Sequence, residues 1–321
     1  MTPGMGSRVV VVTGASSGIG RAAALRFAAR GDRLVLAARA RSALDEVAAG
    51  CRAAGAQVLV VPTDITVAQT VRDLADAAVR RFGRVDVWVD TAAVMAYGRF
   101  EDLPAEVFER VIATDLIGAA TVARVALHRF RAQGARVLIL ASSVLSQVTA
   151  PYLGAYVTAK WGHRGLARVL RQETRDARDI HVCLVTPGSV DTPIYLSAAN
   201  YAGRVGRPPP PMDTPEKVAA AIVRCADRPR AHTSVGLANA VMRFGFAALP
   251  PVYDALVGPL MRLGGLSGEP VDPHEGNVFR ERPRTDAVRG GWGRRWLRPV
   301  AAATAVAGTA GVARWYVHAK W

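Results

Sequence analysis

The chain has 321 residues, of which 50% are hydrophobic and 21% charged, so a mainly disordered protein is excluded. Its 41 basic and 26 acidic residues give a net charge of +15, but nine basic and two acidic residues lie within 280–321, so about half of the surplus belongs to the tail. No nucleic-acid partner is expected, because basic residues are not interleaved with aromatic ones before that tail. Three scattered cysteines favour a reducing, cytoplasmic setting, and no metal site is expected.

Short apolar runs alternate with amphipathic stretches over the first ~235 residues. Strands are predicted at residues 8–13, 34–38, 57–61, 85–90, 136–142 and 181–186, with a seventh near 233–236. Helices are predicted between them, at residues 21–30, 43–54, 67–82 and 105–131. Strands that alternate with helices predict an α/β fold, a doubly wound Rossmann-type parallel sheet with helices on both faces.

The pattern changes after residue 236, which predicts three parts: a nucleotide-binding catalytic domain over 1–240, an extension over 241–298 and a C-terminal apolar helix over 299–321. Residues 241–266 are apolar and interrupted by prolines, which indicates short helices with breaks. Residues 267–298 are rich in Gly, Pro and Arg and are predicted to be loop. The first strand begins so early that no secretory signal is expected before it.

A glycine-rich turn over residues 13–20 lies directly between the first strand and the first helix. Glycine lets the backbone turn tightly and approach a pyrophosphate, which the helix N-terminus then attracts. The residues expected to hold a dinucleotide here are Gly14, Ser16, Ser17, Gly18, Ile19 and Gly20. The second strand ends in Ala38 and Arg39 rather than in an acidic residue that would bind a ribose hydroxyl. This pair predicts NADP(H) rather than NAD(H), with Arg39 on the 2′-phosphate.

Tyr156 and Lys160 are four residues apart at the start of a predicted helix, and so lie on one face. A phenol alone is a poor acid–base catalyst near neutral pH, because its pKa is about 10. A neighbouring ammonium group favours the phenolate and is expected to lower that pKa. Ser143, at the end of a predicted strand, is placed to hold a substrate carbonyl, although a serine there also suits a plain turn.

Together these residues resemble the short-chain dehydrogenase/reductase family over about residues 7–236. The resemblance rests on the glycine turn, Asp64, Ser143, the Tyr156–Lys160 pair and the run Thr186-Pro187-Gly188 with Thr192. It implies that the tyrosine is the general acid–base, that the lysine binds the nicotinamide ribose, and that the serine orients the substrate. It further implies cofactor contacts from Asp64 to the adenine, from Thr192 to the carboxamide, and from Ala92, Pro187 and Gly188.

Two positions depart from the family pattern. The family has an Asn-Ala-Gly run after its fourth strand, where this chain has Asp90-Thr91-Ala92-Ala93. The family's fourth catalytic residue is an asparagine, and Asp115 stands in its place. The resemblance implies that the asparagine acts through its backbone carbonyl, which an aspartate preserves. A carboxylate beside Lys160 also competes for the ammonium charge.

The expected function is NADP(H)-dependent interconversion of a ketone or aldehyde and an alcohol, with a small-molecule substrate. The segments 194–211 and 241–266 favour a hydrophobic substrate, or else cover the sheet or a subunit interface. A cofactor-binding scaffold or sensor without turnover is the rival. The resemblance also implies a homo-oligomer, formed through the helices at 105–131 and 154–176.

Arginines and tryptophans flank fifteen small apolar residues in the tail, 290–321. This placement is typical of interfacial anchors, but the run is shorter than the ~20 residues of a membrane span. Three interpretations remain open: a transmembrane helix, peripheral membrane contact, or a helix packed on the domain or on a partner subunit.

Overall fold

The computed structural model describes residues 7–134, 136–282 and 287–293. The chain divides into two units, residues 1–290 and 291–321, and the features below belong to the first. The predicted C-terminal apolar helix at 299–321 lies outside the described residues.

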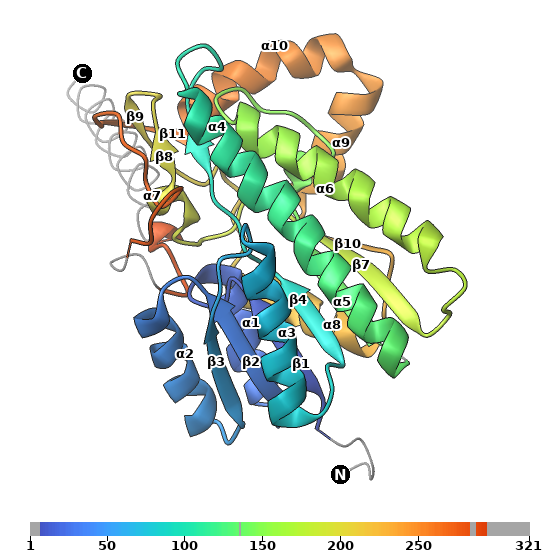
Figure 1. Ribbon diagram of the computed structural model, residues 1–321. Coiled ribbons are helices and arrows are strands. Elements are labelled where there is room, and N and C mark those ends of the chain that lie inside the picture. The colour runs from blue at the N-terminus through green and yellow to red at the C-terminus, as the bar shows by residue number, and fades with distance from the viewer. Residues whose placement is uncertain (1–6, 135, 283–286, 294–321) are drawn as a thin grey trace, which may run out of the picture. The chain divides into compact units, whose positions relative to one another are not determined.

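A seven-stranded sheet in the order β10-β7-β6-β4-β1-β2-β3 forms the centre of this unit, with every pair of neighbours parallel (Figure 1). The strands are β1 (Val9–Thr13), β2 (Arg33–Ala38), β3 (Val58–Pro62), β4 (Val87–Asp90), β6 (Arg136–Ala141), β7 (Ile180–Pro187) and β10 (His232–Val235). β1 is buried along its whole length, as its run of valines predicts for a strand covered on both faces.

Helices cover both faces of the sheet and build two separate cores. One face carries α1 (Gly18–Ala28), α2 (Arg41–Ala53) and α8 (Pro215–Asp227). The other carries α3 (Ala68–Phe82), α5 (Ala119–Gln133) and α6 (Gly154–Glu173). The predicted doubly wound Rossmann-type fold is therefore confirmed, and the seven predicted strands all form.

The predicted helix at 105–131 is one helical run with an irregular centre. It consists of α4 (Ala105–Ile112), a π-helical segment η1 (Ala113–Gly118) and α5. By length and hydropathy this run would suffice to cross a membrane, but half of its most apolar window is buried within the protein. Single π-helical turns inside α-helices often mark functional sites, and η1 contains Asp115.

The apolar region after residue 236 forms short helices, as predicted: α9 (Ala238–Ala248), α10 (Pro250–Leu260) and η3 (Met261–Gly265). The prediction that 267–298 is loop is wrong at its start. Strand β11 (Leu266–Pro270) pairs antiparallel with β9 (Arg204–Gly206), which lies about sixty residues earlier. No local pattern in a Gly- and Pro-containing segment indicates such a distant partner.

Three short elements border the carboxyl ends of the strands. They are η2 (Val144–Ser146), α7 (Ile194–Ser197) and a two-residue parallel pairing of β5 (Ala96–Tyr97) with β8 (Ala199–Asn200). These elements hold the loops that follow β4, β6 and β7 beside one another, and so they shape the region above the sheet.

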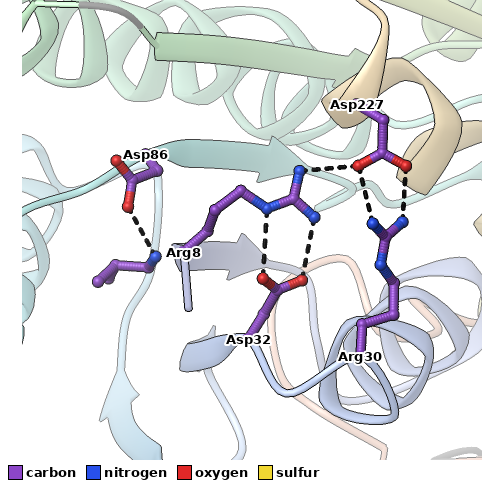
Figure 2. Close-up of polar contacts among 6 residues, drawn as sticks. Arg8, Arg30, Asp32, Asp86 and Asp227 are labelled. Atoms are coloured by element: carbon purple, nitrogen blue, oxygen red, sulfur yellow. Dashed lines mark hydrogen bonds and ion pairs between the residues drawn. The ribbon is translucent and has the colours of Figure 1, made fainter. Parts of the chain in front are cut away.

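An ionic network closes the opposite, amino end of the sheet (Figure 2). The Arg8 guanidinium donates to both carboxylate oxygens of Asp32, at 3.2 and 3.1 Å, and to Asp227 at 2.9 Å. Arg30 also binds Asp227 through two hydrogen bonds, at 2.6 and 3.1 Å. Asp86 accepts the first backbone N–H of β1 at 2.9 Å. These contacts join the starts of β1 and β2 to the end of α8.

Candidate active site

The glycine turn follows β1 at the carboxyl end of the sheet, where close packing requires the absence of side chains. Gly14 has φ +76°, and a Cβ there would lie 2.6 Å from the Ala92 nitrogen. A Cβ on Gly20 would lie 2.2 Å from the Gly14 oxygen. Helix α1 begins at Gly18 after an extended Ser17 whose side chain makes no capping bond. The positive end of the α1 dipole therefore faces a backbone cradle that suits a phosphate.

A cleft of about 170 Å³ runs along this turn. Of the residues predicted to bind the cofactor, the cleft brings together Gly14, Ser16, Ser17, Gly18, Ile19, Gly20, Arg39, Asp64, Ala92 and Thr192. Pro187 and Gly188 lie instead on the wall of a larger neighbouring cavity, together with Thr192. The donors of the cleft are helical N–H groups, hydroxyls and a guanidinium, which fits a phosphorylated nucleotide.

Arg39 and Asp64 face this cleft but already have partners within the protein. Arg39 donates to the backbone oxygens of Asn277, at 2.6 Å, and Val278, at 3.3 Å. Asp64 accepts the Thr66 N–H at 2.9 Å and its hydroxyl at 2.7 Å, so its carboxylate closes the loop after β3.

Arg110 of α4 completes this arrangement, and the sequence analysis missed it. Its guanidinium binds Asp64 at 2.8 Å and the Thr66 hydroxyl at 3.0 Å. Burial alone raises the pKa of Asp64, but the bonds from Thr66 and the charge of Arg110 outweigh it and lower that pKa. The role of Asp64 towards an adenine stays a prediction.

Tyr156 and Lys160 lie one turn apart on α6, as their spacing predicts. The Lys160 ammonium is 5.1 Å from the centroid of the Tyr156 ring. Ser143 lies two residues after the end of β6 and caps η2, where its hydroxyl accepts the Leu145 N–H at 3.1 Å. Ser143 also lies close enough to Tyr156 to lower the pKa of its phenol. The structure therefore brings the three predicted catalytic side chains to one place.

Asp115 joins this cluster from the π-helical segment. Its Oδ2 lies 2.9 Å from the Lys160 ammonium, and its Oδ1 accepts the Val94 N–H at 2.8 Å. Both side chains of this ion pair are almost completely buried, with 0% and 1% exposed. The lysine thus has an anionic partner that an asparagine at position 115 would not supply.

Burial and this carboxylate together raise the pKa of Tyr156 above its ordinary value. Lys160 and Ser143 act in the opposite direction but do not overcome them. The net shift is therefore opposite to the expected lowering by the ammonium group. Burial lowers the pKa of Lys160, but Asp115, Tyr156 and Asp90 together raise it further, so the lysine stays protonated.

Asp90, at the end of β4, is a second buried carboxylate whose importance the sequence analysis missed. Only 1% of it is exposed, and burial raises its pKa to about 6. It accepts the Thr13 hydroxyl at 2.7 Å and the Ala92 N–H at 3.3 Å. The sequence places Asp90 in the run that departs from the family pattern, but its closeness to Lys160 and Asp115 was not visible there.

A cavity of about 860 Å³ opens beside Tyr156 and Ser143. The residues that line both this cavity and the cofactor cleft are Ile19, Thr91, Ala93, Thr192 and Ile194. Aliphatic side chains of α9, α10 and η3 form its outer wall, including Val241, Val252, Leu256, Leu260 and Leu263. The two spaces therefore adjoin at the five residues that line both of them.

The loop predicted to contact substrate contributes only in part. Tyr195 and the prolines at 209–211 line the cavity. Tyr201 does not, because it packs with Leu103 and Phe108 in a separate apolar cluster.

Comparison with known proteins agrees with this geometry. The family model described as short chain dehydrogenase matches residues 8–200. The chain is 30% identical to the uncharacterized oxidoreductase YxnA of Bacillus subtilis, over 94% of this chain and 88% of that protein. It is 37% identical to the cis-4-hydroxycyclohexanecarboxylate dehydrogenase of Sinomonas cyclohexanicum, over 63% of this chain and 84% of the relative.

Among solved structures, the alcohol dehydrogenase of the archaeon Thermococcus sibiricus, in complex with 5-hydroxy-NADP, superposes with a TM-score of 0.62. That match has 29% sequence identity and covers 72% of this chain and 96% of the archaeal one. A glycine turn after β1, a Tyr–Lys pair on α6 and a family match over more than half of the chain lead to one conclusion. The chain belongs to the short-chain dehydrogenase/reductase family and is an oxidoreductase.

Proposed function

We propose that the protein is an NADP(H)-dependent oxidoreductase that interconverts a ketone or aldehyde with its alcohol on a bulky apolar substrate. One observation carries this proposal. Tyr156 and Ser143 both line the large cavity, and this cavity shares wall residues such as Ile19 and Thr192 with the cofactor cleft.

The preference for NADP(H) rests on the charge at the end of β2. Ala38 occupies the position where an acidic residue would bind a ribose hydroxyl, and Arg39 follows it inside the cleft. The archaeal structural relative, which is in complex with an NADP analogue, supports the same choice.

The chain's own residues supply the acid–base part of the reaction. The bound cofactor supplies the hydride that adds to the carbonyl carbon. Tyr156 donates its proton to the carbonyl oxygen as negative charge develops there, and Ser143 donates a hydrogen bond to that oxygen. Lys160 stabilises the resulting phenolate until Tyr156 is reprotonated. In the oxidative direction the phenolate accepts the alcohol proton.

The apolar cavity determines the class of substrate. Its volume of about 860 Å³ lies at the upper end of the range for small-molecule sites, and aliphatic side chains dominate its outer wall. Removing apolar substrate surface from water contributes about 25 cal/mol per Å², so a large hydrophobic carbonyl compound gains most from this site.

A series of ketones and aldehydes of increasing apolar size, assayed by NADPH oxidation, tests the proposal. We expect kcat/KM to rise with apolar size and to be lower with NADH at equal concentration. A preference for small polar carbonyl compounds, or for NADH, would contradict it.

The buried Asp115–Lys160 ion pair favours a second candidate, a cofactor-binding protein with little or no turnover. A carboxylate 2.9 Å from the ammonium weakens the support that Lys160 gives to a phenolate. Tight NADPH binding together with no turnover in either direction across the substrate series would select this candidate.

A further inference from the structure

A C-terminal strap, residues 274–282 and 287–290, packs across the carboxyl edge of the sheet beyond the region that the family model matches. Its first part is fixed by backbone pairing. His274 and Asn200 exchange backbone hydrogen bonds of 2.8 and 3.0 Å, and the Asn277 N–H donates to Ser197 at 2.7 Å. Val278 is completely buried, and a Cβ on Gly276 would lie 2.3 Å from the Ser197 oxygen. This end of the strap is therefore packed as tightly as a core segment.

The second part of the strap has its own anchors. The Gly290 N–H donates to the Asp191 oxygen at 3.3 Å, and Arg289 pairs with Glu216 of α8 at 3.1 Å. Val288 packs against the first hydrophobic core. Both described parts of the strap are thus held on the same edge of the sheet.

The strap contacts two groups that were expected to bind the cofactor. The oxygens of Asn277 and Val278 accept from the Arg39 guanidinium, and the Ala287 oxygen accepts the Gly18 N–H at 2.8 Å. A guanidinium has five N–H donors, so these two bonds set its orientation and leave donors for an anion. The strap therefore positions Arg39 at the cleft.

Three strap side chains, Asn277, Glu281 and Arg282, line the cofactor cleft itself. Glu281 acts on Arg39 by Coulomb attraction. We propose that the strap is the outer wall of the cofactor site, and that Arg282 favours, and Glu281 opposes, a 2′-phosphate on the ribose. This inference rests on the proposed NADP(H) function and extends it to a segment outside the nucleotide-binding motifs.

Electrostatics gives the direction of each effect. A 2′-phosphate adds negative charge beside Arg39, so a further cation in the same cleft strengthens binding and an anion weakens it. A bare 2′-hydroxyl carries no charge, so the same two residues change its binding much less. Opposite charges on one strap thus adjust the choice between two otherwise identical cofactors.

Direct binding of NADPH and NADH to the full chain, by titration calorimetry, tests the proposal without turnover. We expect Arg282→Gln to weaken NADPH binding about tenfold and Glu281→Gln to strengthen it about threefold, with NADH changing less than twofold. Arg280→Gln and Glu275→Gln are matched controls. Both are exposed on the same strap and neither lines the cleft, so NADPH binding should stay within about twofold of wild type.

A second measurement does not depend on a substitution. Amide hydrogen exchange at residues 274–282 should slow when NADPH is added to the wild type. Equal effects of Arg282→Gln and Arg280→Gln, or unchanged exchange in the strap, would overturn the assignment while leaving the proposed function intact. Failure of the wild type to prefer NADPH over NADH would instead contradict the proposed cofactor.

Discussion

Charged residues lie at both ends of the central sheet, but the two sets differ in how far they are buried and in how they are paired. At the amino end, Arg8 lies between Asp32 and Asp227, and most of these charges are paired through two hydrogen bonds and partly exposed (Figure 2). At the carboxyl end, Asp115 and Lys160 are an ion pair with almost no exposure, and Asp90 lies buried nearby.

This difference separates charges that stabilise from charges that react. Arg30 and Arg8 lower the pKa of Asp227 although burial raises it, so that carboxylate stays ionised under ordinary conditions. Burial instead raises the pKa values of Asp90 and Tyr156. A shifted pKa marks a candidate functional group when the residue also lines a cleft, and Tyr156 lines the large cavity whereas Asp227 does not. The predictions below test this division in order of expected effect.

Removing the proton donor should give the largest effect. Tyr156→Phe should lower kcat at least ~1,000-fold, because it removes the hydroxyl that donates the proton and leaves the ring beside Lys160. NADPH affinity should change less than about twofold, since the ring stays in place. Steady-state kinetics measures kcat, and calorimetric titration measures NADPH affinity. Retention of full reductase activity would show that the carboxyl end does not react through Tyr156.

Neutralising the buried carboxylate should move the pH profile. In Asp115→Asn the Val94 N–H keeps its acceptor, but Lys160 loses its anionic partner, so the pKa of Tyr156 should fall. Alcohol oxidation requires the phenolate, so the rising limb of its pH–rate profile should move to lower pH by about one unit. At a fixed pH on that limb, the rate should rise about tenfold. Profiles of kcat/KM for alcohol oxidation measure this shift.

Asp90→Asn is the matched control for that profile. It replaces a second buried carboxylate at the same end of the sheet, but Asp115 rather than Asp90 is the carboxylate that mainly raises the pKa of Tyr156. The limb should move less than in Asp115→Asn. Equal shifts in both variants, or none in either, would contradict a specific action of Asp115. Appearance of turnover only in Asp115→Asn would identify the wild type as the weak or inactive form.

At the amino end, stability should change and catalysis should not. Arg8→Gln leaves Asp32 without its paired hydrogen bonds and should lower the free energy of unfolding by about 1–3 kcal/mol. The loss should shrink progressively as pH falls below about 4 and through the lowered pKa of Asp227, because that carboxylate is then protonated and no longer attracts Arg8.

Urea denaturation over a pH series measures the effect of Arg8→Gln. The exposed Arg41–Asp45 pair is the control, and Arg41→Gln should change stability by less than about 0.5 kcal/mol. If fully folded Arg8→Gln had a lower kcat than the wild type, the amino end of the sheet would affect catalysis as well as stability, which would contradict this division.

The smallest effect should come from the wall of the substrate cavity. Leu256→Ala removes about three side-chain carbons from a half-exposed position on the cavity wall. The KM for a bulky substrate should therefore rise about threefold. KM for a small substrate should stay unchanged. Phe244 of α9 is also exposed, but it does not line the cavity. Phe244→Ala should therefore change neither the KM for the bulky substrate nor the KM for the small one.

Most of the fold follows from local sequence patterns. Seven strands were predicted within a few residues of their observed bounds, because buried valine-rich runs are distinctive. The pairing of β11 with β9 was missed, because it depends on two segments whose own composition favours loop. The π-helical turn inside the helix at 105–133 was missed for a similar reason, since a helical pattern does not report a local change of hydrogen bonding.

The site was predictable where residues act through short spacing. Tyr156 and Lys160 share one turn of α6, and their relation is visible in the sequence. The sequence did not show that the pKa of Tyr156 is raised, because this shift depends on burial and on a carboxylate from another helical segment. Arg110 and Asp90 carry no local signal that distinguishes them from solvated charges.

The sequence by itself determined the alternation of strands and helices, the glycine turn and the Tyr–Lys pair, since each is set by neighbours within a few residues. The tertiary structure alone decided that the strap holds Arg39 through oxygens 238 and 239 positions away, and it gave the closeness of Asp115 to Lys160 that the family resemblance had implied. The energies of such contacts depend on burial and on distance in space, and neither is encoded in any short stretch of chain.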